Sequence, residues 1–181
     1  SKTEVNNISE SLMLNSNVLG VAPYIETQGL LSSGTYLKGV YIFGIDPHYE
    51  KNVSTIENHF IDGSLDSLKD NKYNLVIGDI LAIQLGLRLG DSINILVPET
   101  ALGLAGILPR TKKFKITGIF SLGAPEIDQS YVYLNTNKAS KLLRTGESVH
   151  GIRIRYSNLF NAKDYIRSDL VRINKEFQKS Y

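Results

Sequence analysis

The stretch LVIGDILAIQLGLRLGDSINILV, residues 75–97, predicts a strand, a short helix and a second strand in that order. Its first three residues form an apolar run that is typical of a buried strand. Gly78 interrupts this run, and the carboxylate of Asp79 is suited to accept backbone N–H groups at the start of a helix. Gly86 is suited to the left-handed conformation that ends many helices. The stretch therefore predicts a structural unit around which the rest of the chain is arranged.

Two spacing patterns predict which side chains of this unit face the core. In the helix, Ile80, Ile83 and Leu87 recur at three- and four-residue intervals, which predicts a buried face that includes Ile83. In the second strand, alternate residues form an apolar face made of Ile93, Ile95 and Val97. These side chains have no reactive groups, so we expect the function to lie elsewhere in the chain.

The composition limits the class of protein. The 181 residues are enough for one domain or two small ones, and the formal net charge of +2 is too small to indicate a nucleic-acid partner. The sequence contains no cysteine, which excludes disulfides, thiolate zinc sites and cysteine nucleophiles. No apolar run reaches the roughly 20 residues that a membrane-spanning helix needs. We therefore expect the chain as given to be soluble.

Further helices and strands are predicted on both sides of this unit. We expect a weakly amphipathic helix in residues 1–17, strands at 18–31 and 36–45, a turn at Asp46-Pro47 and an irregular segment at 48–71. Pro23 lacks an N–H group, so the first strand should lie at an edge or contain a bulge there. Downstream, strands are expected at 114–120, 131–134 and 149–156. Helices are expected from Asn135 to Gly146 and after Asn158, the last with a core face made of Ala162, Ile166, Leu170, Ile173 and Phe177.

Residues 98–113, PETALGLAGILPRTKK, lie between two predicted hairpin strands and have no clear helical or strand period. A connection of this length is uncommon in a compact domain and is usually functional. Its two prolines and two glycines favour a projecting loop, whereas its leucines would also suit a loop folded onto the core. The cations that follow, Arg110, Lys112, Lys113 and Lys115, suit either a docking surface or an ordinary solvated strand face.

The sequence offers no constellation of catalytic residues. The three histidines, at positions 48, 59 and 150, lack the spacing of a metal site. No nucleophile elbow, Walker loop or dinucleotide-binding fingerprint is present. We therefore expect a protein that is not an enzyme and that has no cofactor and no metal.

Five segments occur in an order that resembles the periplasmic domain of lipoprotein-releasing ABC-transporter permeases of the LolC/LolE type. They are GVAPYIETQGLL (residues 20–31), VYIFGIDP (40–47), LVIGDILAIQLGLRLGDSINILVPE (75–99), FKITGIFSLGAPEID (114–128) and YVYLNTNKASKLL (131–143). The resemblance extends over about residues 18–156. Efflux permeases of the MacB type are similar in general scaffold.

This resemblance implies an α+β fold of two subdomains. Residues 1–31 and 130–181 would form a mixed α/β, porter-like subdomain from both chain ends. Residues 32–129 would form a mostly β, sabre-like subdomain whose loop at 98–113 is a projecting hairpin hook. A shift near residue 130, from mostly strand to alternating strand and helix, is visible in the sequence independently of the resemblance.

The resemblance also implies a function and a set of partners. The chain would be the periplasmic domain of an inner-membrane permease in a Gram-negative bacterium, which passes lipoproteins to the periplasmic chaperone LolA. A cytoplasmic ATPase subunit, LolD, would hydrolyse ATP, and a second permease subunit would complete the transporter. The residues implied in docking are Leu102, Gly103, Leu104, Ala105, Gly106, Ile107, Leu108, Pro109, Arg110 and Lys112.

Two other functions stay open at this point. A MacB-like efflux permease would use the same kind of domain to dock an adaptor protein. A small enzyme on a cradle-like β scaffold is the third reading, because GD-x-I strands occur in several barrels.

Overall fold

The computed structural model describes residues 2–34, 36–69, 72–98, 109–158 and 160–178. Its helices are α1 (Lys2–Met13), α2 (Pro47–Val53), α3 (Asp79–Leu85), α4 (Pro125–Asp128), α5 (Thr136–Leu143) and α6 (Ala162–Gln178). Its strands are β1 (Val18–Ser33), β2 (Tyr36–Ile45), β3 (Phe60–Gly63), β4 (Asn74–Gly78), β5 (Ser92–Val97), β6 (Arg110–Phe120), β7 (Tyr131–Asn135) and β8 (Gly151–Tyr156). Short 3₁₀ turns, η1 (Ile56–His59) and η2 (Leu65–Lys69), flank β3.

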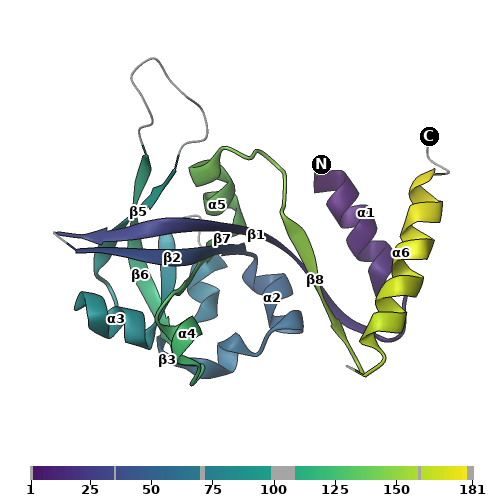
Figure 1. Ribbon diagram of the computed structural model, residues 1–181, viewed down its shortest axis with the longest axis horizontal. Coiled ribbons are helices and arrows are strands. Elements are labelled where there is room, and N and C mark those ends of the chain that lie inside the picture. Colours follow the sequence, from purple (N-terminus) through teal and green to yellow (C-terminus); the bar gives the residue numbers. More distant parts are fainter. Residues whose placement is uncertain (1, 35, 70–71, 99–108, 159, 179–181) are drawn as a thin grey trace, which may run out of the picture.

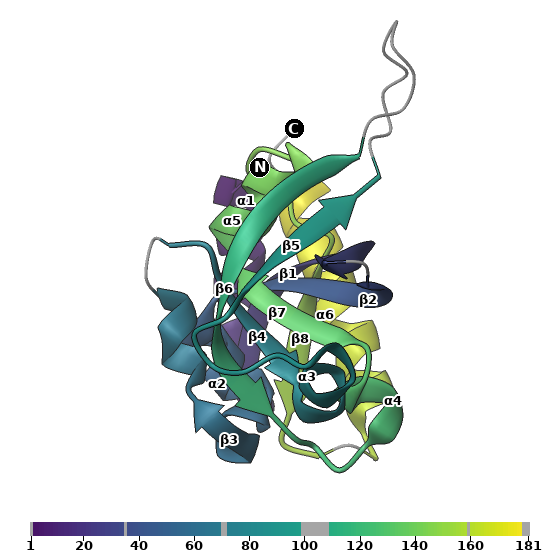
Figure 2. The same ribbon diagram turned by 90° about the vertical axis from the view of Figure 1, so that its left-hand side faces the viewer.

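Among the described residues, the strands β2, β7, β4, β6, β5 and β1 follow one another in a single sheet, and β1 also pairs with β2. This last pairing closes the sheet into a ring, since Leu30 of β1 lies opposite Gly39 of β2 and also opposite Leu96 of β5. The β2–β7 and β4–β6 pairs are parallel, and β3 is added antiparallel to β6. Figure 2 shows the strands crossing one another around this ring. The fold is thus mixed α/β with one large sheet.

Apolar side chains from alternate strand positions fill the interior of the ring. The predicted inward face of β5 is confirmed: Ile93, Ile95 and Val97 are all buried. A second cluster, around Phe120 and Tyr133, lies where η1 and η2 cover the sheet. Burial in this second cluster raises the pKa of the Tyr133 hydroxyl well above its usual range.

The strand–helix–strand unit predicted at residues 75–97 is confirmed as β4, α3 and β5. Gly86 adopts the left-handed conformation, with φ of 64°, and its N–H group binds carbonyls of the last turn of α3. The predicted core face of this unit is wrong at Ile83, whose side chain is 78% exposed, whereas Leu87 packs against the core as predicted. Leu81 and Ala82 face the core instead. A helix of two turns packs through one short edge, so the apolar spacing did not determine its rotation.

Residues 48–69 contain more regular secondary structure than the irregular segment predicted at 48–71. The expected turn at Asp46-Pro47 is the start of α2, where the Asp46 carboxylate accepts a hydrogen bond from the N–H of His48 at 2.9 Å and Pro47 is the first helical residue. The short elements η1, β3 and η2 follow. An Asp-Pro pair suits both a turn and a helix start, and the sequence pattern did not distinguish between them.

The first half of β1 leaves the ring and pairs with β8, and helices α1 and α6 pack beside this two-stranded extension (Figure 1). At Pro23 the described pairing of β1 is with β8 alone, which agrees with the predicted edge position. Both chain ends therefore contribute to one small unit beside the ring. The buried members of its hydrophobic cluster are Leu12, Val18, Val21 and Tyr156.

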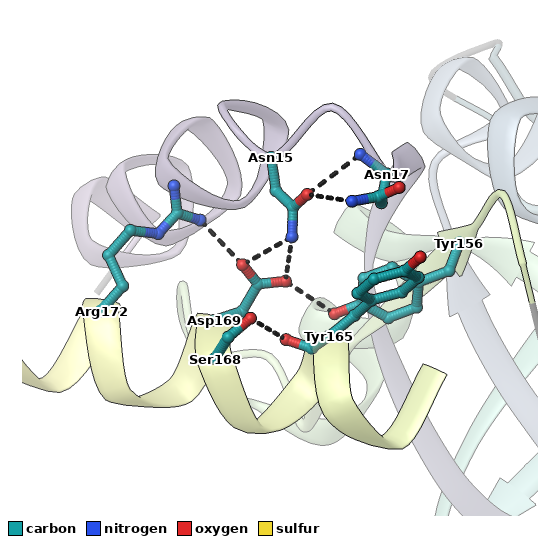
Figure 3. Close-up of polar contacts among 7 residues, drawn as sticks. All are labelled: Asn15, Asn17, Tyr156, Tyr165, Ser168, Asp169 and Arg172. Carbon is teal, nitrogen blue, oxygen red and sulfur yellow. Dashed lines mark hydrogen bonds and ion pairs between the residues drawn. The ribbon is translucent and has the colours of Figure 1, made fainter. Parts of the chain in front are cut away.

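A buried carboxylate lies at the centre of this terminal unit (Figure 3). Asp169 of α6 is 3% exposed and accepts hydrogen bonds from the Asn15 amide at 3.0 and 3.1 Å, from the Tyr156 hydroxyl at 2.9 Å and from Arg172 at 3.0 Å. Burial and the neighbouring Asp169 carboxylate raise the pKa of Tyr156 to about 12. The network connects the end of α1 to β8 and α6.

The predicted core face of α6 is confirmed at Ala162 and Ile173, which pack against the cluster of the terminal unit, and is wrong at Ile166 and Leu170. Ile166 and Leu170 are exposed, whereas Tyr165, Asp169 and Ile173 face the terminal unit. The helix begins at Ala162, and the Asn158 side chain accepts a hydrogen bond from the N–H of Phe160 one turn earlier rather than capping the helix. Similarly, α5 ends at Leu143 with Arg144 in the left-handed conformation, two residues before the predicted Gly146.

A second ion pair connects the ring to the extension. Glu50 of α2 is 1% exposed and binds the guanidinium of Arg153 of β8 at 2.6 Å. Burial raises the pKa of Glu50, and the Arg153 charge opposes this effect. Close approach at Gly20 of β1, where a Cβ atom would lie 2.5 Å from the Asn52 carbonyl oxygen, allows α2 to pack tightly here.

Strand β7 and helix α5, which the sequence analysis assigned to the terminal subdomain, pack within the ring. β7 pairs with β2 and β4, and Val132, Leu134, Ala139 and Leu142 belong to its hydrophobic core. The division between hydrophobic clusters therefore falls after α5 instead of near residue 130.

Candidate functional site

The predicted hairpin around residues 98–113 is confirmed in its stem. Strands β5 and β6 pair antiparallel from Ser92 opposite Lys115 to Val97 opposite Arg110. Figures 1 and 2 show the two strands rising together past β1 and β2 on one side of the ring. Because β6 begins at Arg110, the last four residues of the predicted loop belong to the strand.

The docking residues expected from the resemblance are divided between described and undescribed parts. Pro109, Arg110 and Lys112 are described, at the end of the stem. Leu102, Gly103, Leu104, Ala105, Gly106, Ile107 and Leu108 lie outside the described residues.

The cations of β6 lie on two opposite faces. Arg110 and Lys112 share the face of β6 whose next members, Phe114 and Ile116, are buried in the core. Lys113 and Lys115 lie on the outer face and are exposed. The four cations therefore do not form one surface. Only Arg110 and Lys112 continue the inward-facing row of β6, at the end of the ring from which the hairpin extends.

Arg110 is partly buried and contacts α5. Its Nη1 donates a hydrogen bond to the carbonyl oxygen of Leu143, the last residue of α5, at 2.7 Å. The unpaired carbonyls at a helix C-terminus form its negative end, so a guanidinium is well placed there. This contact was missed in the sequence, because nothing in the pattern relates positions 110 and 143.

Lys112 lies over an aromatic ring. Its Nζ is 4.4 Å from the centroid of Tyr73, and Nζ of Lys138 is 4.9 Å from the same centroid. The Tyr73 ring in turn meets Phe114 edge-on, with centroids 5.3 Å apart. Lys138 of α5 is only 4% exposed. A cation–π contact with Tyr73 thus fixes the Lys112 side chain beside the closed sheet.

An apolar groove lies at the end of the hairpin stem that leads into the loop. It has a volume of about 600 Å³, and Leu30, Tyr41, Leu96, Pro98 and Pro109 are among the residues that line it. Gly39 leaves space there, since a Cβ at this position would have no atom within 4 Å. Apolar surface next to cationic groups is the chemistry of a protein-docking surface.

The described residues contain no group of three or more His, Cys, Asp or Glu side chains that could hold a metal ion. In the same part of the chain, none of the helices combines the length and the apolar character that crossing a membrane requires.

The model of the MacB-like periplasmic core domain family matches residues 3–167. The chain belongs to this family. The sequence is 36% identical over 162 residues to the lipoprotein-releasing system transmembrane protein LolC of Xylella fastidiosa (strain 9a5c), covering 90% of this chain and 39% of that protein. The resemblance to the periplasmic domain of LolC/LolE-type permeases is therefore confirmed. The chain spans about two fifths of the length of this relative.

Two solved transporter domains have a fold similar to that of this chain. The extracellular domain of the noncanonic ABC-type transporter YknZ from Gram-positive bacteria matches with a TM-score of 0.66 at 12% identity, covering 97% of this chain and 83% of that one. The periplasmic region of MacB from Actinobacillus actinomycetemcomitans matches with a TM-score of 0.59 at 18% identity, covering 91% and 70%. At these identities the likeness concerns the fold alone.

Proposed function

We propose that this chain is the periplasmic domain of an inner-membrane ABC-transporter permease in a Gram-negative bacterium. The permease releases lipoproteins from the inner membrane and passes them to the chaperone LolA, which docks on the loop at the end of the β5–β6 hairpin. The observation that favours this function is the paired stem of that hairpin, which rises from the ring in a chain that is 36% identical to LolC over 162 residues.

The proposal includes the remainder of the transporter. ATP hydrolysis takes place in a separate cytoplasmic subunit, LolD, and a second permease subunit completes the complex. The terminal unit of α1, β8 and α6 corresponds to the porter-like part, and the ring corresponds to the sabre-like part. Motion driven by the ATPase reaches this domain through its two ends, which lie side by side in α1 and α6 (Figure 1).

The chemistry of the hairpin end supports docking of a protein. Residues 99–108 contain three leucines and an isoleucine. Interfaces take most of their binding energy from a few apolar or aromatic anchors that become buried. The groove beside Leu96 and Pro98 adds apolar surface at the loop end of the stem, and Lys112 adds a cation on the other face of the hairpin.

Leu104→Asp is expected to weaken LolA binding by about 30-fold or more while leaving the melting temperature unchanged. The reason is that a charged carboxylate cannot replace an apolar anchor in a desolvated contact, and loss of such an anchor costs about 2 kcal/mol or more. Binding of purified LolA to the isolated domain, measured by titration calorimetry, checks this.

Leu14→Asp is the matched control, because it makes the same chemical change at a side chain that is 77% exposed beside α1, away from the hairpin. It should leave LolA binding intact. If Leu104→Asp unfolds the domain and binding follows the folded fraction, the loop belongs to the core and the docking proposal fails.

Lys112→Glu is expected to slow association with LolA, and more strongly at low salt than at high salt. Surface charges mainly steer the encounter of two proteins, and salt screens them. We assign electrostatic steering to the exposed Lys112 and not to Arg110, because the guanidinium of Arg110 is bound to the Leu143 carbonyl. Stopped-flow rates at two salt concentrations measure the effect, with exposed Lys163→Glu on α6 as the control. Equal slowing at both concentrations would contradict electrostatic steering by Lys112.

A MacB-like efflux permease that docks an adaptor protein is the second candidate. The match to the MacB-like family model favours it. The two functions differ in the partner that binds the hairpin, so titration of the domain with LolA separates them. Absence of LolA binding by the unmodified domain would favour the efflux function.

A further inference from the structure

The hairpin stem is attached to the rest of the molecule by contacts with α5 as well as by its own strands. Arg110 is the first residue of β6 and forms the last described rung of the stem, opposite Val97. Its Nη1 donates to the Leu143 carbonyl at 2.7 Å, at the C-terminal end of α5. A charged donor on a helix C-terminal carbonyl combines a strong hydrogen bond with a favourable helix dipole.

A second contact joins the same two elements. Lys112 of β6 and Lys138 of α5 both lie over the Tyr73 ring, at 4.4 and 4.9 Å. The stem therefore contacts α5 directly at Arg110 and indirectly at Lys112, through the Tyr73 ring that lies between the two lysines and is shared with α5. At this end β5 also pairs with β1, through Leu96 opposite Leu30, whereas residues 110–114 of β6 have only β5 as their described strand partner. Contacts with α5 therefore help to determine how firmly β6 is held there.

Helix α5 is itself a firm support. Ala139 and Leu142 are buried in the core of the ring, and a Cβ at Gly44 would lie 2.4 Å from Cβ of Ala139, so helix and sheet are in tight contact. At its start, the Asn135 side chain accepts from the N–H of Asn137 at 2.9 Å and donates to the Leu68 carbonyl at 3.0 Å. Both ends of α5 are thus fixed, one to the ring and the other to the stem.

We propose that Arg110 is a positioning residue that fixes the end of the β5–β6 stem to the C-terminus of α5 and so sets the direction in which the hairpin meets its partner. The attachment to α5 stands on the geometry alone, whereas its consequence for LolA rests on the proposed function. Arg110 acts through the stem and the Leu143 carbonyl, and it need not touch the partner itself.

Three variants test this. Arg110→Gln removes the charge, Arg110→Lys keeps a cation that can reach the Leu143 carbonyl, and Lys113→Gln removes a charge from the exposed outer face of the same strand. Hydrogen exchange measures how firmly the amides of residues 96–97 and 110–111 are held, and titration with purified LolA measures docking. Thermal melting checks that each variant is folded.

Arg110→Gln is expected to lower exchange protection at the stem end by about tenfold, as loss of one charged hydrogen bond would do, and to weaken LolA binding by a similar factor. Arg110→Lys should recover most of both effects. Lys113→Gln should leave stem protection unchanged and alter LolA binding by no more than about twofold, since exposed charges contribute little.

Unchanged stem protection in Arg110→Gln would overturn the attachment. Reduced protection with normal LolA affinity would overturn the positioning role. If the unmodified domain does not bind LolA but Arg110→Gln still loosens the stem, the attachment is supported and the proposed function fails.

Discussion

Leu81→Ala is expected to lower the free energy of unfolding by about 2–5 kcal/mol, whereas Ile83→Ala, on the same helix, should change it by less than about 0.5 kcal/mol. Leu81 of α3 is fully buried in the core of the ring, and its truncation leaves a cavity. Ile83 is 78% exposed, so its truncation removes little contact. Denaturant unfolding of the two variants measures the difference in unfolding free energy, provided that their m values are the same.

The pair also tests the rotation of α3. The spacing of Ile80, Ile83 and Leu87 predicts a core face that includes Ile83, whereas the structure turns Leu81 and Ala82 inward. A loss of several kcal/mol in Ile83→Ala, with little effect of Leu81→Ala, would support the face predicted from the sequence and contradict the structure.

The strands could be predicted from the sequence because their signals are local. Alternation over residues 92–97 and a glycine at each end of α3 determine which residues are extended and which side of β5 faces inward. The match of β2 with residues 36–45 has the same origin. Closure of the sheet into a ring depends on pairing between β1, β2 and β5, which local patterns do not contain.

The face of α6 could be predicted only in part, because its inward positions include a polar residue. On α6, the apolar side chains of Ile166 and Leu170 point to solvent while the Asp169 carboxylate points inward. A buried carboxylate is tolerated where its hydrogen-bonding capacity is satisfied, and the partners of Asp169 come from α1, β8 and α6. No periodicity within one helix reveals partners that are distant in the sequence.

The candidate site was predictable only in part. The break in periodicity after Val97 located the hairpin, since an apolar connection between two strands is unusual. The contacts that hold its stem were not predictable, because Arg110, Tyr73 and Lys138 are brought together by the fold. The sequence left open whether the cations form a docking surface or a solvated strand face, and the alternation of β6 divides them between two faces.

Asp169→Ala is expected to lower the free energy of unfolding of the terminal unit by about 2–4 kcal/mol. The substitution leaves the Tyr156 hydroxyl and the Asn15 amide without their acceptor. Of the two, the hydroxyl is the more deeply buried, since Tyr156 is 7% exposed. Arg172 adds less to this total, because its side chain is about one third exposed and water can replace the carboxylate.

Hydrogen exchange measured segment by segment locates this loss. Amides of α1, β8 and α6 should exchange faster, while those of β4, β5 and β6 in the ring should change little, because the two parts have separate hydrophobic clusters. Asp164→Ala is the matched control, an exposed aspartate in the first turn of the same helix, and it should cost less than about 1 kcal/mol. Equal loss of protection in both parts would mean that the ring and the terminal unit unfold as one cooperative body.

The same variant separates docking from coupling. The Asp169 network joins α1 to α6, and the hairpin stands on the opposite side of the molecule (Figure 1). LolA affinity of the isolated Asp169→Ala domain should therefore equal that of the unmodified domain, because the β5–β6 stem and α5 remain in place. If the chain acts in a permease as proposed, loosening the contact between α1 and α6 should reduce lipoprotein release. Motion of the transporter would then be transmitted less effectively from these two helices to the closed sheet. Normal release by a permease with Asp169→Ala would show that the ends of this domain do not transmit the motion.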